Sequence, residues 1–305
     1  MARRRRGRRV DGIIVLDKPA GISSNDAVQQ VKRLFGAQKV GHTGSLDPLA
    51  TGVLPLCFGE ATKFSQFLLA SDKHYWVRIR LGIATETGDA DGEVISSSDA
   101  SGVTRADIEQ ALVRYRGEIQ QVPSMYSALK HNGQPLYKLA RQGIEVEREA
   151  RCVTVFGNEI CAFDTPELEL DIRCSKGTYV RSIAEELGRD LGVGAHVSAL
   201  RRKGAGPYTE ADAVTIGFLE EERANGSLDR FLMPTASAVG QWPEVRLSDA
   251  TSFYLRQGQP VLVPHAPTTG WVRLSENHGD ELQFIGVGEV LDDGRIAPRR
   301  LVVGS

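Results

Sequence analysis

The alternation of apolar and polar residues along the chain predicts a mixture of strands and helices. Residues 12–16 form a continuous apolar run, which is typical of a buried strand. In residues 74–82 every second residue from Tyr75 onward is apolar, which predicts a half-buried strand with Tyr75 on its inward face. We expect further strands at residues 152–156, 168–174 and 195–202.

Apolar residues at helical spacing predict helices between these strands. Ser23 and Ser24 are N-cap candidates for a helix that ends at Gly36, and Thr104 with Asp107 resembles a capping box. A glycine turn at Gly177 precedes another helix. The expected helices cover residues 24–35, 61–68, 105–115 and 178–191. Residues 203–240 are polar and irregular, and predict loops.

Two segments do not follow this pattern of alternating strands and helices. Residues 119–150 interleave basic and aromatic residues around a turn at Asn132-Gly133. This mixture suits the binding of single-stranded nucleic acid, and it equally suits a partly buried amphipathic hairpin. From residue 244 to residue 305, short apolar runs are separated by glycine and proline, which predicts a small β-rich domain. The whole pattern predicts an α+β fold with an antiparallel or mixed sheet and a β-rich appendage.

Charge is distributed unevenly along the chain. Residues 3–9 contain six arginines, and without them the net charge changes from −2 to −8. A mildly acidic body therefore carries a basic tail at residues 1–9. Such a tail can contact phosphates, or it can be a disordered and solvated segment.

The cysteine and histidine content excludes several classes of protein. None of the four cysteines is in CxxC spacing, and the six histidines are scattered, so we expect neither a zinc site nor a disulfide framework. This usage fits a reducing cytoplasm. The apolar run at residues 12–16 is too short for a signal peptide or a membrane span. We therefore expect a cytoplasmic protein without a metal and without membrane association.

The loop GHTGSLDPLATG, residues 41–52, contains one carboxylate, Asp47. It lacks the lysine of a phosphate-binding loop, and the chain has no GxSxG elbow and no paired acid in this loop. A lone carboxylate can act as a nucleophile or base if an arginine keeps its pKa low. The residues alone leave a second interpretation open, in which Asp47-Pro48 is a turn.

Several longer motifs together resemble bacterial tRNA pseudouridine-55 synthases of the TruB type. They are LDKPAGISS (16–24), GHTGSLDPLATGVLP (41–55), SDKHYWV (71–77), VPSMYSALKHNGQPLYKLARQG (122–143), CSKGTYVRS (174–182) and LRR (200–202). The match covers nearly the whole chain from about residue 10. It implies the pseudouridine-synthase α+β fold around a mixed sheet over residues 10–240, with an RNA-gripping insertion at about 119–150. It also implies a PUA-like RNA-binding domain at residues 244–305.

The resemblance also implies roles for particular residues. Asp47 would be the catalytic carboxylate and Arg181 its partner, without any cofactor. Five residues would bind the substrate. His42 would fill space vacated by flipped bases, and Tyr75 would stack on the target base. Tyr179 and Leu200 would line the pocket, and Lys18 would border it. Without the resemblance, most of these residues would be read as ordinary core or loop residues.

The implied substrate is the T-arm stem-loop of tRNA, in which a uridine is isomerised to pseudouridine. Three hypotheses compete: this enzyme acting alone as a monomer, an RNA-binding or RNA-folding protein with vestigial catalysis, and a relative that depends on a guide RNA. The presence of Asp47, Tyr75 and Arg181 argues against loss of catalysis. The chain has no long basic extension at its C-terminus, which favours the form that acts without a guide RNA.

Overall fold

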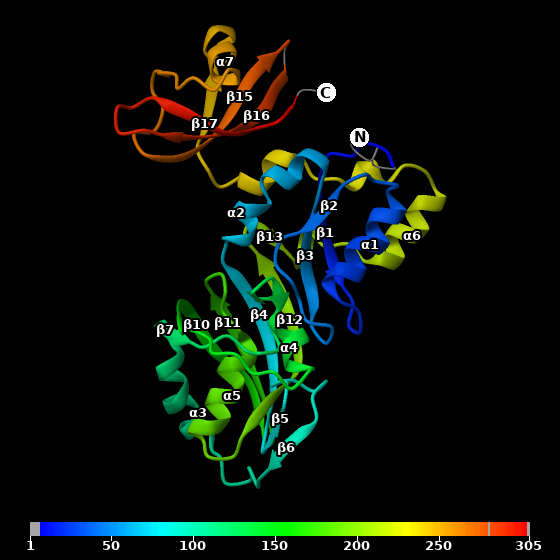
Figure 1. Ribbon diagram of the computed structural model, residues 1–305, viewed down its shortest axis with the longest axis vertical. Coiled ribbons are helices and arrows are strands. Elements are labelled where there is room, and N and C mark those ends of the chain that lie inside the picture. Colours follow the sequence, from blue (N-terminus) through cyan, green and yellow to red (C-terminus); the bar gives the residue numbers. More distant parts are fainter. Residues whose placement is uncertain (1–6, 280, 304–305) are drawn as a thin grey trace.

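A mixed nine-stranded sheet forms the centre of the larger, N-terminal part of the molecule (Figure 1). The computed structural model describes residues 7–279 and 281–303. The strands of this sheet are β1 (Gly12–Lys18), β2 (Val40–His42), β3 (Thr51–Phe58), β4 (Lys73–Leu81), β7 (Gly117–Gln121), β10 (Arg151–Asp164), β11 (Glu167–Cys174), β12 (Ala195–Ala205) and β13 (Tyr208–Thr209).

The order of strands is β1-β3-β12-β4-β11-β10-β7, with β2 paired to β3 and β13 paired to β12. Strands β3 and β12 run parallel, and the other pairs are antiparallel. The parallel pair joins the N-terminal hairpin of the sheet to its later strands. It therefore brings residues near position 50 beside residues near position 200, where Thr51 pairs with Arg201.

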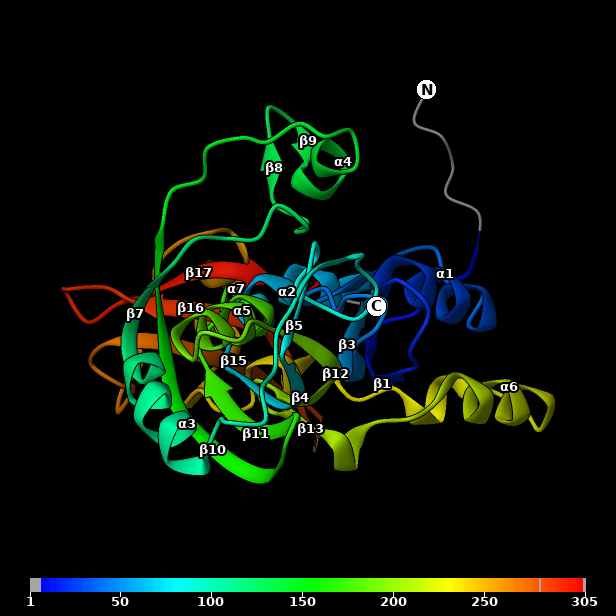
Figure 2. The ribbon, with the colours of Figure 1, turned by 90° about the horizontal axis from the view of Figure 1, so that it is seen from below.

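Helices cover one face of this sheet and enclose the main core. They are α1 (Ser24–Leu34), α3 (Arg105–Leu112) and α5 (Val180–Asp190), and α6 (Ile216–Ala224) packs beside α1 (Figure 2). Ser23 with Asp26, and Thr104 with Asp107, form capping boxes that start α1 and α3. These two predicted helix starts are confirmed.

The segment between β7 and β10 stands away from the sheet (Figure 2). It contains β8 (Lys130–His131), β9 (Gln134–Pro135) and α4 (Leu136–Ala140). Asn132 and Gly133 have φ values of 50° and 84°, the left-handed pair that a tight hairpin requires. The excursion begins after Gln121, because residues 119–121 still belong to the edge strand β7. We call residues 122–150 the insertion.

A second hairpin consists of β5 (Ile83–Thr85) and β6 (Val94–Ser97). Its two strands are connected by the acidic turn, which lies within TETGDADG, residues 85–92. The C-terminal part contains a four-stranded sheet and one helix, drawn at one end of the molecule in Figure 1. Its elements are β14 (Glu244–Leu247), α7 (Asp249–Arg256), β15 (Gly270–His278), β16 (Glu281–Val290) and β17 (Ile296–Leu301). The α+β class with a mixed sheet and a β-rich C-terminal part is thus confirmed.

Three local predictions were wrong. Strand β3 was missed, because Gly52 and Pro55 are unfavourable in strands and the segment resembled a loop. Helix α6 lies within a segment that we expected to be irregular; Thr215 caps it, and only Leu219 of its side chains is buried. Residues 61–68 form the end of a 3₁₀ helix and most of the short α2 (Ser65–Leu69) rather than one helix.

The predicted basic tail, residues 1–9, is only partly within the described residues. Residues 1–6 lie outside the described residues. Arg8, inside the predicted tail, donates to the Asp229 carboxylate at 2.5 Å and to the carbonyl of Phe35 at 2.7 Å. This arginine is therefore attached to the folded body.

Candidate active site

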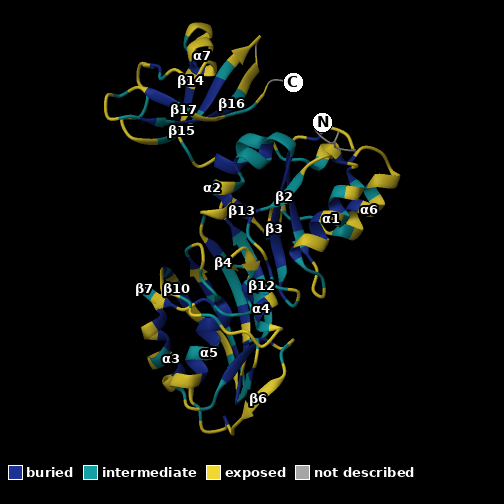
Figure 3. Cartoon of the chain, in the orientation of Figure 1, coloured by how far each residue is buried: buried dark blue, intermediate teal, exposed yellow. Residues whose placement is uncertain are grey.

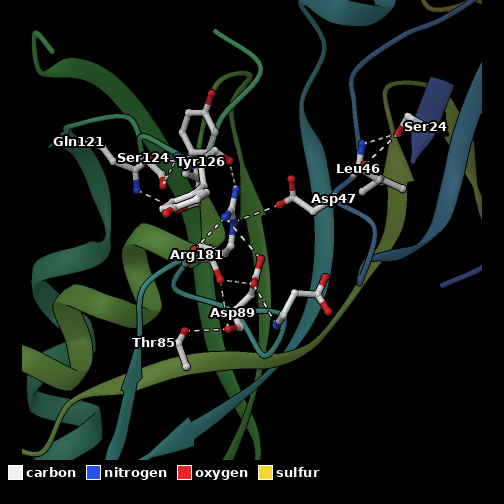
Figure 4. A network of polar contacts seen from close by, with 12 residues as sticks. Ser24, Leu46, Asp47, Thr85, Asp89, Gln121, Ser124, Tyr126 and Arg181 are labelled. Atoms are coloured by element: carbon white, nitrogen blue, oxygen red, sulfur yellow. Dashed lines mark hydrogen bonds and ion pairs between the residues drawn. The ribbon is translucent and has the colours of Figure 1, made fainter. Parts of the chain in front are cut away.

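Residues 43–50, which we call the Asp47 loop, connect β2 to β3 and are held by buried polar contacts. The Ser24 hydroxyl accepts from the Leu46 amide at 2.7 Å and donates to the Leu46 carbonyl at 3.0 Å (Figure 4). Lys18 donates to the carbonyl of Pro48 at 3.3 Å. Leu46 and Ala50 are buried in the core. These anchors on both sides of Asp47 fix where its carboxylate lies.

Asp47 forms an ion pair with Arg181, which stands in the first turn of α5. The Arg181 Nε lies 3.0 Å from Oδ2 of Asp47 (Figure 4). The Arg181 side chain is 5% exposed, whereas the Asp47 side chain is 39% exposed. The arginine is therefore a buried support, and the carboxylate still reaches open space. The predicted pair is present in the structure.

Arg181 makes three more contacts, with two other segments of the chain. Its Nη1 donates to the carbonyl of Thr87 at 2.8 Å and lies 3.4 Å from the Asp89 carboxylate. Its Nη2 donates to the carbonyl of Tyr126, in the insertion, at 2.8 Å. The planar fork of a guanidinium suits this set of acceptors, because its donors point in fixed directions.

Asp89 is a site residue that the sequence did not identify. It is 5% exposed, accepts from the Thr87 hydroxyl at 2.5 Å, and faces Arg181. TETGDADG, residues 85–92, reads from its sequence only as an acidic turn. Its sequence gave no sign that one of its acids is buried, since that depends on the pairing of residues 88–90 with Val197 of β12.

The pKa of Asp47 is raised from its ordinary value, chiefly because the surrounding protein removes water from its carboxylate. The positive charges of Arg181 and Lys18 oppose this shift, while the negative charge of Asp89 adds to it. The sequence led us to expect an arginine that lowers the pKa of Asp47. Arg181 does act in that direction, but desolvation outweighs it.

A cavity of about 380 Å³ opens beside Asp47. It brings together five of the predicted site residues: Asp47, Tyr75, Tyr179, Arg181 and Leu200. These residues come from the Asp47 loop, β4, the N-terminus of α5 and β12, so the cavity exists only in the folded sheet. Burial raises the pKa of the Tyr75 phenol, which keeps this ring neutral.

Two predicted substrate-binding residues do not line this cavity. Lys18 is fully buried, and its Nζ donates to the carbonyls of Pro19, Ile22 and Pro48 at 2.7–3.3 Å. Burial also lowers the pKa of Lys18 to about 8. Its contacts indicate that it supports the Asp47 loop. His42 lies half-buried on β2, and burial lowers its pKa.

Within residues 7–279 and 281–303, no group of three or more His, Cys, Asp or Glu side chains is placed to hold a metal ion. No helix in this part of the chain is long and apolar enough to cross a membrane.

Comparison with known proteins adds family assignments to this geometry. The model of the N-terminal domain of TruB family pseudouridylate synthases matches residues 32–180. A tRNA pseudouridylate synthase B C-terminal domain model matches residues 181–240, and a pseudouridine synthase II TruB C-terminal model matches residues 243–302.

Full-length relatives are close. The chain is 57% identical to tRNA pseudouridine synthase B of Pseudomonas aeruginosa (strain UCBPP-PA14), over 99% of both chains. It is 54% identical to the protein of the same name from Coxiella burnetii (strain RSA 493 / Nine Mile phase I), over 97% of this chain and 96% of the relative.

Two solved structures share the fold. One is an H/ACA RNP bound to a substrate RNA containing 2′-deoxyuridine, with a TM-score of 0.71, 24% identity, and coverage of 96% of this chain and 85% of that chain. The other is a Cbf5-Nop10-Gar1 complex, with a TM-score of 0.71, 26% identity, and coverage of 96% and 84%. On the strength of the domain matches and the full-length relatives, the chain belongs to the TruB family of pseudouridylate synthases and is an isomerase.

Proposed function

We propose that this chain, acting alone as a monomer, converts the uridine at position 55 in the T-arm loop of tRNA to pseudouridine. The observation that carries the proposal is the Asp47–Arg181 ion pair at 3.0 Å, which presents a carboxylate to a cavity lined by Tyr75 and Leu200. The full-length relatives named tRNA pseudouridine synthase B support tRNA as the substrate.

The reaction needs little besides a positioned carboxylate. The N1–C1′ bond of the uridine breaks, the base turns within the cavity, and a C5–C1′ bond forms. The hydrogen on C5 leaves as a proton and N1 gains one, so atoms and electrons balance without an oxidant. Asp47 is the group that serves as nucleophile toward C6 or C1′, or as the base. Arg181 favours the ionised form of this carboxylate and so opposes the desolvation that raises its pKa.

Access to the cavity requires that the uridine leave the stack of the RNA loop. Extruding a base costs a few kcal/mol, and stacking on an aromatic ring returns roughly 1–3 kcal/mol. Tyr75 fits this role because it lies in the cavity wall with Asp47 and Arg181. Leu200, 8% exposed, supplies apolar wall in the same cavity.

The test is to map pseudouridine in unmodified tRNA treated with wild-type protein and with Asp47→Asn. No guide RNA is added. We expect formation at position 55 with the wild type and none with Asp47→Asn, while tRNA affinity stays within roughly tenfold, about 1.4 kcal/mol. Asp164→Asn, at an exposed position at the end of β10, serves as the control and should retain activity.

The outcomes separate the three hypotheses. Turnover by Asp47→Asn would remove Asp47 from the reaction. Binding without turnover by the wild type would favour an RNA-folding protein. Turnover that appears only after a guide RNA is supplied would place the chain with guide-dependent enzymes, whose Cbf5 structures share its fold.

A further inference from the structure

Arg202 is a buried arginine without an acidic partner. It lies on β12, is 1% exposed, and lines the same cavity as Asp47. Its Nε donates to the carbonyl of Val53 at 2.6 Å and its Nη2 to the carbonyl of Gly44 at 3.1 Å. Within the described part of the chain, no carboxylate lies within 4.0 Å of its guanidinium nitrogens.

The two other arginines of this region are paired. Arg181 contacts the carboxylates of Asp47 and Asp89, and Arg201, next to Arg202, contacts Asp17 at 2.9 Å. A guanidinium is always charged, and a buried charge without an opposite charge is unfavourable. Two carbonyl groups offset only part of this cost. The fold therefore keeps an uncompensated positive charge beside the cavity.

Lys73 strengthens the positive charge beside Arg202. It is 8% exposed, lines the cavity, and donates to the carbonyls of Leu68, Leu69 and Ser71 at 2.5–3.1 Å, so that it contributes charge rather than a free donor. Burial, and next the charge of Arg202, lower its pKa to about 8, so it is largely protonated at neutral pH. Neither Lys73 nor Arg202 has a carboxylate within ion-pair distance in the described residues.

The wall of the cavity thus carries two kinds of charged group. The Asp47–Arg181 pair combines opposite charges, whereas Arg202 and Lys73 are positive and have no carboxylate within ion-pair distance in the described residues. The Ser127 hydroxyl, in the wall contributed by the insertion, is buried and has no hydrogen-bond partner among the described groups. Arg202 and Ser127 can supply donors to an anion, and Lys73 adds positive charge. A nucleotide in an RNA chain likewise combines a neutral base with anionic phosphates.

We propose that Arg202, assisted by Lys73, binds a backbone phosphate of the RNA next to the extruded uridine while the base lies against Asp47 and Tyr75. The inference rests on the proposed function. The phosphate supplies the negative charge that Arg202 lacks in the free protein, and a guanidinium suits phosphate because its donors match two oxygens at once. The base and its backbone are then both held in the cavity.

The experiment combines protein variants with uncharged phosphates. T-arm stem-loop RNAs are made with a single methylphosphonate at each linkage near the target uridine, and their affinities are measured with wild-type protein and with Arg202→Met. We expect one linkage at which the wild type loses at least about tenfold in affinity, because hydrogen bonds to charged groups are strong. The Arg202→Met protein should bind the modified and unmodified RNAs at that linkage equally well.

Arg201→Met is the matched control, since Arg201 lies beside Arg202 and is paired with Asp17 and Glu210. It should show the same methylphosphonate effect as the wild type. If each methylphosphonate lowers affinity equally in the wild type and in Arg202→Met, the proposal is overturned. Arg202 would then only hold the backbone of Gly44 in place. If Arg202→Met does not fold, Arg202→Gln replaces it, because its side chain is uncharged and can still donate to a carbonyl of Val53 or Gly44. A methylphosphonate effect unchanged from the wild type in that variant would again overturn the proposal.

Wild-type turnover on unmodified tRNA distinguishes this inference from the proposed function. If the wild type turns over tRNA but no methylphosphonate effect on affinity depends on Arg202, the phosphate contact is refuted and the proposed function is not. No turnover and no binding of the stem-loop refutes the proposed function, and the phosphate contact is then refuted with it.

Discussion

At the scale of single residues, Arg181 connects the Asp47 carboxylate to the rest of the site. Its guanidinium contacts Asp47, Asp89, Thr87 and Tyr126, which belong to three separate segments of the chain. A loss of this side chain would release the Asp47 loop, the acidic turn and the insertion from one another. The geometry of the fork is therefore as important as its charge.

Arg181→Lys should lower kcat by about 100-fold, because an ammonium cannot reach all of these acceptors. Single-turnover measurements on tRNA check this, together with a thermal melt that shows whether the variant folds. Arg189→Lys, on an exposed face of the same helix, should behave like the wild type. A fully active Arg181→Lys would mean that the positive charge alone is needed.

The raised pKa of Asp47 predicts the pH dependence of the reaction. Under the proposed function the reaction uses the ionised carboxylate of Asp47, so kcat/KM should fall as pH falls through this pKa, at a higher pH than for an ordinary aspartate. The charge of Lys18 lowers the pKa of Asp47. Lys18→Met should therefore move the acidic limb of the profile to higher pH. An unmoved limb would show that Lys18 does not act on the ionisation of Asp47.

At the scale of elements, the parallel pair β3 and β12 sets the position of the Asp47 loop. Gly52 is central to this pair, with a φ of 100° and no room for a side chain, since a Cβ would lie 2.3 Å from the carbonyl oxygen of Arg202. A glycine permits both the left-handed backbone and the close approach of the two strands.

Gly52→Ala should reduce the free energy of unfolding by at least about 2 kcal/mol, from backbone strain and the contact with Arg202. Urea denaturation provides the measurement. Gly41→Ala is the control, because Gly41 lies on the neighbouring strand β2 and a Cβ there would meet nothing within 4 Å. A similar stability for both variants would contradict this account of the strand pair.

The same elements show how far the sequence could predict the structure. Strand β4 and helix α5 have strong periodicity, so their inward faces and the placement of Tyr75 and Arg181 could be predicted. Strand β3 could not, because Gly52 and Pro55 mask its pattern and one of its partners, β12, lies about 150 residues away. The burial of Asp89 likewise depends on a distant strand. Local patterns carry no information about such partners.

At the scale of the whole molecule, an aromatic cluster joins the C-terminal part to the sheet domain. Phe67, next to Leu68 in α2, lies 4.7 Å from Trp242 and 5.1 Å from Trp271, measured between ring centroids. Phe64 lies 5.4 Å from Phe284 of β16. Phe64 is buried and the other four rings are half-buried, and Figure 3 colours the chain at this junction accordingly. The cluster therefore connects the two parts through several ring contacts.

Phe67→Ala should loosen the junction, because the variant removes the ring that contacts both tryptophans. We expect the free energy of unfolding to fall by about 2 kcal/mol, less than for a fully buried phenylalanine. Tryptophan fluorescence should shift to longer wavelength as Trp242 and Trp271 gain contact with water, and protease should cleave near residues 240–243 faster than in the wild type. Phe218→Ala is the control, since Phe218 packs on Phe231 near α6, away from the junction. Equal protease sensitivity in the two variants would show that the cluster does not fix the C-terminal part.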